Sequence, residues 1–256
     1  MKPSDSVPGR PDAAVDELLL YRGADYLLSD QILIHQPTLD EICLYGEKEY
    51  YQMVITLTSV PADLKWQLWD MGIDYTKIDE FQLFYSFLSK YYGREQTSIL
   101  FGDLDLQKFE PYVNKENQEV VMYDSAGELI IDAQLYRKMT RYLRQMHGLV
   151  KDEKKPANET TKQILIEDAR DEYLRYKDKE YHSHLRNMIS AMVNSEGFKY
   201  NLDQVWNMKI YAFMDSVRRI AKIKNAGLLL ESGYSGFGIS LKEINKKELD
   251  WMGDLD

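Results

Sequence analysis

The stretch Gln31-Ile32-Leu33-Ile34-His35-Gln36-Pro37-Thr38-Leu39-Asp40-Glu41-Ile42 combines both kinds of regular structure in one short run. Its first part, Gln31–His35, is a short apolar run of the kind that forms a strand. Its second part begins a helix, because Thr38 and Glu41 have the capping-box spacing, in which each side chain satisfies a backbone N–H at the helix entrance. A strand that leads directly into a capped helix indicates an α+β fold.

On the N-terminal side of this stretch, short apolar runs predict a small β-hairpin or meander. The runs Leu18–Tyr21 and Tyr26–Leu28 resemble strands, and polar turn residues separate them from each other and from Gln31–His35. Residues 1–15 are polar and rich in proline, and they lack the apolar stretch of a secretion signal. We expect these residues to form a flexible leader.

On the C-terminal side, glycines and capping residues divide the chain into helices, followed by a change to strands. Helices are predicted from Thr38 to Gly46 and over 47–57, 63–71 and 80–92. Strands are predicted over 98–101, 108–113, 119–123 and 129–131, which makes a central β-meander. A helix from Asp132 to His147 follows, with Gly148 just past its end.

The segment 150–158 is charged and contains Pro156, so it is the best linker in the sequence. It separates a predicted α+β domain, residues 16–150, from a predicted helical domain, residues 159–256. In the second domain the pattern predicts helices over 159–176, 181–194, 201–208 and 210–227, a glycine-rich loop over 233–238, and a last short helix after the Ser240 and Glu243 capping box. The overall prediction is a mainly helical α+β protein, with an N-terminal β-hairpin, helices, a small central β-meander and a helical C-terminal region.

Charge and cysteine content limit the classes of partner. The chain of 256 residues carries 42 acidic and 32 basic side chains, a net charge of −10. This excess opposes nonspecific binding to nucleic acid or to anionic membranes, and no apolar run is long enough to span a bilayer. We therefore expect neither a membrane nor a nucleic-acid partner. The one cysteine, Cys43, lies between apolar neighbours and is predicted to be a buried, inert thiol.

Patterns that could carry chemistry each have a simpler structural explanation. His182 and His184 are two apart, and on a helix such side chains point about 200° away from each other, so they do not face one metal ion. Asp103 and Asp105 have no further ligand or base near them in sequence. The basic end of the segment 201–224 has helix-turn-helix spacing but also suits a helix C-terminus. We therefore predict no catalytic, metal-binding or cofactor-binding residues, and no cofactor.

Aromatic residues offer a different kind of site. They make up 12% of the chain, and Trp66 and Trp69 share one face of a predicted helix. Exposed aromatic side chains anchor protein partners, and buried ones fill a core. The candidates for partner binding are Trp66, Trp69, Trp206, Phe213, Tyr234 and Phe237, each of which could equally be a core residue.

Two stretches resemble a known family. Ile34–Ile42 resembles the opening of tail assembly chaperones of long-tailed phages of Gram-positive bacteria, and Val205–Met214 resembles the helical tails of the same proteins. The resemblance implies a non-enzymatic morphogenesis protein that binds the tape measure protein, or the tail tube protein, in the host cytoplasm. It is compatible with a homo-oligomer and with a longer, frameshifted form.

Three other functions remain open from the sequence. The first is a structural virion component of the tail or the head–tail junction. The second is an enzyme whose site is assembled from distant residues, of which His35, His147, Asp103 and Glu128 are the first candidates. The third is a nucleic-acid-binding regulator that uses Asn201–Lys224.

Overall fold

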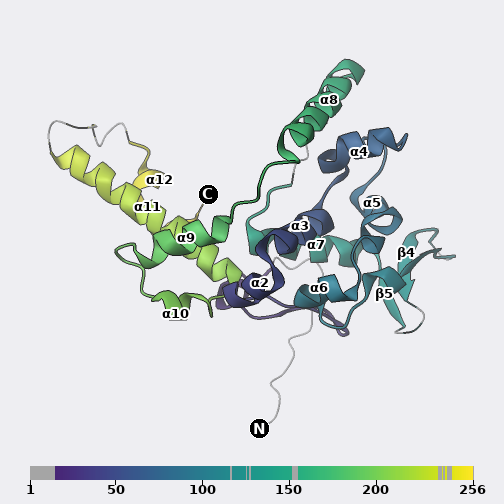
Figure 1. Ribbon diagram of the computed structural model, residues 1–256, viewed down its shortest axis with the longest axis horizontal. Helices are drawn as coiled ribbons and strands as arrows, with labels where there is room; N and C mark the ends of the chain where they lie inside the picture. Colours follow the sequence, from purple (N-terminus) through teal and green to yellow (C-terminus); the bar gives the residue numbers. More distant parts are fainter. Residues whose placement is uncertain are drawn as a thin grey trace, which may run out of the picture.

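The computed structural model describes residues 15–115, 117–124, 126, 128–151, 155–235, 238, 240 and 244–255. Its architecture is the predicted one: an N-terminal hairpin, helices, a small three-stranded sheet, and then C-terminal helices (Figure 1). The predicted leader lies outside the described residues, apart from Val15, which is buried. The glycine loop and the Ser240–Glu243 capping box are only partly described.

The N-terminal elements are α1 (Glu17–Arg22), β1 (Tyr26–Ser29) and β2 (Ile32–Ile34). The prediction of a strand at Leu18–Tyr21 is wrong, because a capped helix forms there. The side chain of Asp16 accepts hydrogen bonds from the amides of Leu18 and Leu19, at 3.0 and 3.1 Å. Gly23 ends the helix with φ of 78°, a conformation that favours glycine. Strands β1 and β2 then pair antiparallel as predicted.

The predicted capping box begins α2 (Leu39–Tyr45). The Glu41 amide donates to Thr38 Oγ1 at 3.2 Å, and the Thr38 amide donates to Glu41 Oε2 at 2.6 Å. Gly46, at φ of 105°, separates α2 from α3 (Glu47–Thr58). Cys43 is exposed rather than buried, because Leu39 and Ile42 take the inner face of this short helix.

The next segment consists of short helical pieces: η1 (Pro61–Leu64), α4 (Lys65–Asp70), α5 (Glu80–Ser86), η2 (Leu88–Lys90), α6 (Arg94–Phe101) and η3 (Leu106–Lys108). The single helix predicted over 80–92 is interrupted at Phe87, whose φ of −136° is not helical. The strand predicted over 98–101 is wrong, because these residues are the end of α6. The Gln96 side chain accepts from the Gly93 amide at 2.9 Å and so caps this helix.

The central sheet contains β3 (Glu110–Val113), β4 (Val120–Asp124) and β5 (Leu129–Ile131), paired antiparallel in that order. It is followed by α7 (Ala133–His147), which is capped by the Asp132 side chain and closed by Gly148 at φ of 65°. The sheet buries Met122 and Ile131, and β5 contacts α7. The predicted meander and the helix after it are confirmed.

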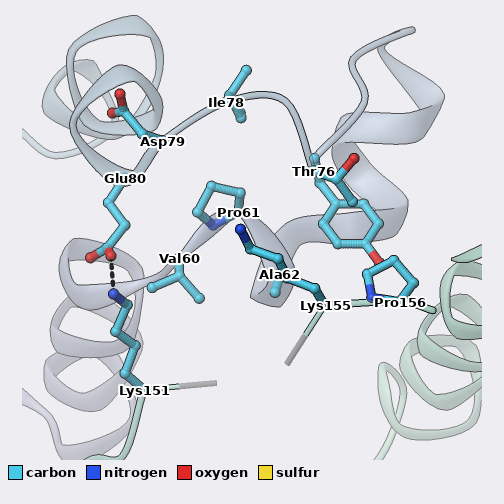
Figure 2. A pocket seen from close by; sticks show the side chains of 11 residues that line it. Val60, Pro61, Ala62, Thr76, Ile78, Asp79, Glu80, Lys151, Lys155 and Pro156 are labelled. Atoms are coloured by element: carbon cyan, nitrogen blue, oxygen red, sulfur yellow. Dashed lines mark ion pairs between the residues drawn. The ribbon is translucent and has the colours of Figure 1, made fainter. Parts of the chain in front are cut away.

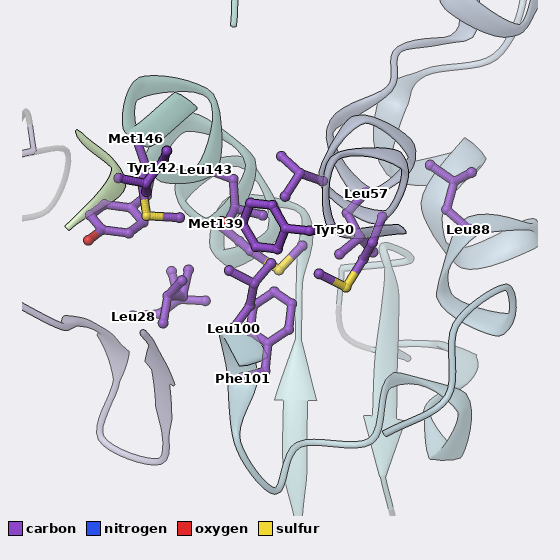
Figure 3. Close-up of a cluster of buried hydrophobic side chains, with 14 of the residues drawn as sticks. Leu28, Tyr50, Leu57, Leu88, Leu100, Phe101, Met139, Tyr142, Leu143 and Met146 are labelled. Atoms are coloured by element: carbon purple, nitrogen blue, oxygen red, sulfur yellow. The ribbon is translucent and has the colours of Figure 1, made fainter. Parts of the chain in front are cut away.

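The main core lies around α3 and α7 (Figure 3). Tyr50 of α3 and Leu143 of α7 are fully buried there, beside Leu100 and Phe101 of α6. The same cluster includes Ile210 and Phe213, which have no exposed surface. The core therefore joins the first half of the chain to the long helix that begins at Ile210.

A buried polar pair lies inside this core. His147 Nδ1 is 2.7 Å from the Leu143 carbonyl oxygen, which can only accept, so Nδ1 carries the proton. His147 Nε2 then accepts from the Tyr50 hydroxyl at 2.6 Å. Burial lowers the pKa of His147 to about 4, although the Leu143 hydrogen bond opposes this shift. The imidazole is therefore neutral at neutral pH.

The remaining helices are α8 (Glu159–Tyr176), α9 (His184–Val193), α10 (Leu202–Val205), α11 (Ile210–Tyr234) and α12 (Lys246–Leu249). Helix α11 continues past Gly227, where it was predicted to end. Helices α8 and α11 project from the rest of the chain in different directions, α8 toward the upper right and α11 toward the upper left of the view (Figure 1). In the described part of the chain, no helix combines the length and the apolar character needed to cross a bilayer.

Helix α8 packs on α4 across the predicted linker. Trp66 lies on Tyr173 with ring centroids 5.0 Å apart, and Lys162 forms an ion pair with Asp74 at 3.0 Å. The division into domains at residues 150–158 remains a prediction, and these contacts connect the two sides of it.

Candidate functional site

The segment Gln31–Ile42 is joined to a distant part of the chain by backbone hydrogen bonds. The amides of Leu39 and Asp40 donate to the carbonyls of Met208 and Trp206, both at 3.0 Å, and the Ile210 amide donates to Pro37 at 3.0 Å. Thr38 and Lys209 form an antiparallel bridge. The two regions that carry the family resemblance are therefore paired with each other.

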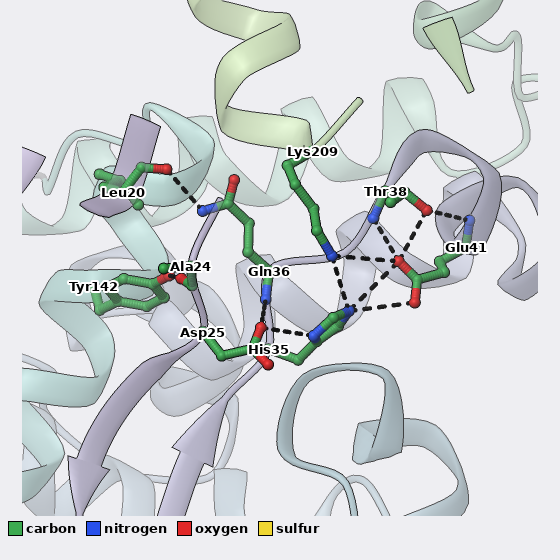
Figure 4. A network of polar contacts seen from close by, with 9 residues as sticks. All are labelled: Leu20, Ala24, Asp25, His35, Gln36, Thr38, Glu41, Tyr142 and Lys209. Atoms are coloured by element: carbon green, nitrogen blue, oxygen red, sulfur yellow. Dashed lines mark hydrogen bonds and ion pairs between the residues drawn. The ribbon is translucent and has the colours of Figure 1, made fainter. Parts of the chain in front are cut away.

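Side chains strengthen this junction (Figure 4). His35 lies between two carboxylates, with Nδ1 2.7 Å from Asp25 and Nε2 3.2 Å from Glu41. Lys209 Nζ approaches Nε2 at 3.5 Å and Glu41 at 3.9 Å. Both ring nitrogens of His35 therefore have partners within this junction. The network holds the hairpin, α2 and the start of α11 together.

A second link is the capping of α9 by Glu47. Its carboxylate accepts from the amides of His184 and Leu185 at 3.0 and 2.9 Å and from the Ser183 hydroxyl. Burial alone raises the pKa of Glu47, but the hydrogen bonds from Ser183, Leu185 and their neighbours outweigh burial, and the net pKa lies below the ordinary value. This contact fixes α9 beside α2 and α3.

An apolar groove of about 480 Å³ lies between α2, α9 and α10. Its apolar wall is made by Leu39, Leu185, Ile189, Val193, Leu202 and Trp206. The exposed thiol of Cys43 belongs to the same lining, and Glu47, Arg186 and Asn194 supply polar groups. The arrangement can hold an apolar side chain or one face of an amphipathic helix.

Another cavity, of about 430 Å³, lies between the end of α3, the start of α5 and the segment that follows α7 (Figure 2). Glu80 forms ion pairs with Lys151 and, at 3.3 Å, with Arg144. Val60, Pro61 and Ile78 are among the apolar residues of its lining. The charge of Glu80 is balanced by these two cationic partners. We assign no chemistry to this cavity.

The aromatic candidates differ in their environments. Trp206 is half-buried in the groove, Trp66 is half-buried against Tyr173, and Trp69 is 41% exposed. Phe213 is a core residue without exposed surface, so it is removed from the set. Tyr234 is 79% exposed at the end of α11, and Phe237 lies outside the described residues.

The residues considered for a hidden enzyme site lie on separate elements. His35 belongs to the junction, and His147 is in the core. Asp103 pairs with Arg94 at the surface, and Glu128 is in the β4–β5 turn with φ of 52°. Among the described residues, none of these four bonds to another, and no group of histidine, cysteine or acidic side chains has the arrangement of a metal site.

Most residues of the groove were not identified from the sequence. Leu185, Ile189 and Leu202 have the spacing of ordinary core positions, and Cys43 was predicted to be buried. Only Trp206 was a candidate. The apolar residues of α9 recur at helical spacing, but nothing in this pattern indicates that part of the apolar face stays uncovered.

Comparison with known proteins adds one finding. Residues 177–256 match the family model described as YomV second domain, a phage-associated family, and this match fits a phage protein. It includes α9 and α10, which form one wall of the groove. Searches among curated proteins and among solved structures gave no match.

Proposed function

We propose that this chain is a non-enzymatic phage morphogenesis protein, a tail assembly chaperone that holds a helical segment of the tape measure protein in the groove between α2, α9 and α10. The observation that carries the proposal is the groove itself, which is open, mainly apolar, about 480 Å³ in volume and lined in part by the half-buried Trp206. A protein that keeps an aggregation-prone partner in solution needs such a surface, and it needs no catalytic group.

The groove suits a helix with one apolar face. Leu202, at its edge, is 55% exposed, and Arg186 and Glu47 supply charges of both signs beside the apolar wall. A helix bound in such a groove contacts it through apolar residues spaced three and four positions apart.

The Leu202→Glu variant tests this occupant. The substitution places a charge on the wall of the groove at a position already half in solvent, so the fold should survive while capture of co-expressed tape measure protein falls about tenfold or more. The matched control is Leu228→Glu on α11, which is 66% exposed and outside the groove. Affinity capture of the tape measure protein is the measurement, and equal capture by both variants would exclude the groove.

Cys43 provides an independent probe, because it is the one cysteine of the chain and lines the groove. Bound tape measure protein should slow alkylation of Cys43, and a bulky adduct there should block capture. The Cys43→Ser variant should still capture the partner and should be unaffected by the reagent. Recovery of the chain in purified particles would favour the alternative of a structural virion component.

A further inference from the structure

A cavity of about 610 Å³ lies where α8 ends and α9 begins. Lysine and tyrosine side chains dominate its lining, which consists of Lys48, Gln52, Tyr173, Tyr176, Lys177, Lys179, Glu180, Tyr181, His182 and His184. It is separate from the groove, with which it shares no residue. Nothing in the proposed chaperone role uses it.

The cavity is locally basic on an acidic protein. Three lysines against one glutamate give its lining a charge of about two positive, whereas the whole chain carries −10. Glu47, which caps α9 and also accepts a hydrogen bond from Tyr181, and Glu49 both act on the Tyr181 ring, so the positive charge of the lining belongs to its lysines and not to the Tyr181 side of the cavity. Charges more than about 8 Å away are largely screened at physiological ionic strength, so the local charge, and not the total, decides which ligand enters.

The tyrosine rings are held in place from one side. Tyr173 rests on Trp66 at 5.0 Å between centroids, Lys179 lies 4.1 Å above the Tyr176 ring, and Tyr181 contacts His184 edge-on. The three tyrosines remain 49%, 52% and 39% exposed. They are therefore oriented before any ligand arrives, which lowers the entropic cost of binding.

Tyrosines and basic side chains recur through the sequence of this segment, with Asp178 and Glu180 among them. From Tyr173 to Arg186 it reads Tyr-Leu-Arg-Tyr-Lys-Asp-Lys-Glu-Tyr-His-Ser-His-Leu-Arg. A flat ring beside a cation, repeated along a groove, is the arrangement by which proteins bind single strands: bases stack on the rings and phosphates lie near the cations. A duplex keeps its base faces inside the stack and cannot use the rings.

We propose that this cavity binds single-stranded nucleic acid, with a base stacked on Tyr176 or Tyr181 and phosphates at Lys177 and Lys179. The expectation of no nucleic-acid partner rested on the total charge, and this site is a local exception to it. The proposal is independent of the tape measure hypothesis.

The test is fluorescence anisotropy of the full chain with labelled oligothymidylate and oligouridylate. Binding should weaken steeply between about 50 and 200 mM salt. The Tyr176→Ala variant should bind about 5- to 100-fold more weakly, while Tyr176→Phe, which keeps the ring, should bind like the parent. The Lys177→Gln/Lys179→Gln variant should reduce the slope of log K against log salt by about 1.4, since each phosphate contact contributes about 0.7 on a single strand.

Matched controls are Lys246→Gln/Lys247→Gln, an equal charge change on exposed α12 residues, and Tyr112→Ala, a tyrosine 56% exposed on β3. Both should bind like the parent, with folding of every variant checked by circular dichroism. Binding of both oligonucleotides, or of only one, supports the site. Absence of binding at low salt, equal binding of a duplex, or equal losses in the controls would overturn it.

Discussion

The Phe213→Ala variant is expected to lose about 3–5 kcal/mol of its free energy of unfolding. Phe213 has no exposed surface and belongs to the core cluster that joins α11 to the first half of the chain. Removing the ring leaves a cavity that the surrounding helices can fill only in part. The loss would be large for a protein whose total stability is about 5–15 kcal/mol.

Urea denaturation followed by circular dichroism measures this change. The matched control is Tyr234→Ala on the same helix, which is 79% exposed and should change stability by less than about 0.5 kcal/mol. If Phe213→Ala does not fold, Phe213→Leu gives a smaller cavity and a measurable intermediate loss. A change below about 1 kcal/mol for Phe213→Ala would return this residue to the set of surface candidates.

Lowering the pH from 7.5 to 4.5 is expected to remove about 2.5 kcal/mol of stability through His147 alone. Its pKa in the folded state is about 4, against an ordinary value of 6.5. Below pH 6.5 the unfolded chain therefore takes up a proton that the folded chain cannot accept. Stability is fully present above that pH and is lost as the pH falls toward 4.

Acidic side chains affect the stability over a lower pH range. The pKa values of Glu41 and Glu47 lie below their ordinary 4.5, and that of Asp74 is lowered to about 2 from 3.8. For an acid with a lowered pKa, stability is lost only as the pH falls below the ordinary value. The interval between pH 6.5 and 4.5 therefore reports on histidine, and urea midpoints measured across it should show the slope.

The Tyr50→Phe/His147→Leu variant is the control for this slope. It removes the titrating ring and the hydroxyl that would otherwise lose its acceptor. Its stability at pH 7.5 differs from the parent, but its loss between pH 6.5 and 4.5 should be smaller by about 2.2 kcal/mol. An unchanged slope would mean that His147 takes up its proton equally in both states.

Local signals predicted much of the fold. The capping box of Thr38 and Glu41, and the Asp132 and Gly148 ends of α7, formed as predicted because each depends on atoms within one helical turn. Errors occurred where a short apolar run satisfies two periods at once. Leu18–Tyr21 and Ser98–Phe101 are both long enough for a strand and for one helical turn, and a cap next to each decided for the helix.

The candidate site was much harder to predict than the fold. The groove brings Cys43 of α2 together with Leu202 and Trp206. No pattern of neighbouring residues in the sequence indicates that these distant positions lie close together. Cys43 is exposed because α2 is covered on one face only, the face of Leu39 and Ile42. Aromatic content made Trp206 a candidate, and the structure places it in the lining of the groove. The same signal could not separate Trp206 from Phe213, since burial is a property of the assembled chain.

The backbone ladder between Pro37–Asp40 and Trp206–Ile210 sets the timing of assembly during synthesis. His35 and Lys209, which close it, are 174 positions apart. At about 5–20 residues per second, a ribosome needs about 9–35 s to make that interval. Over this time the first amides of α2 depend on water, and the groove lacks the walls that α9 and α10 supply until those helices have been made. The apolar surface proposed for the partner is thus incomplete until Trp206 has been added, so a shorter nascent chain has no groove with which to capture the tape measure protein or a copy of itself.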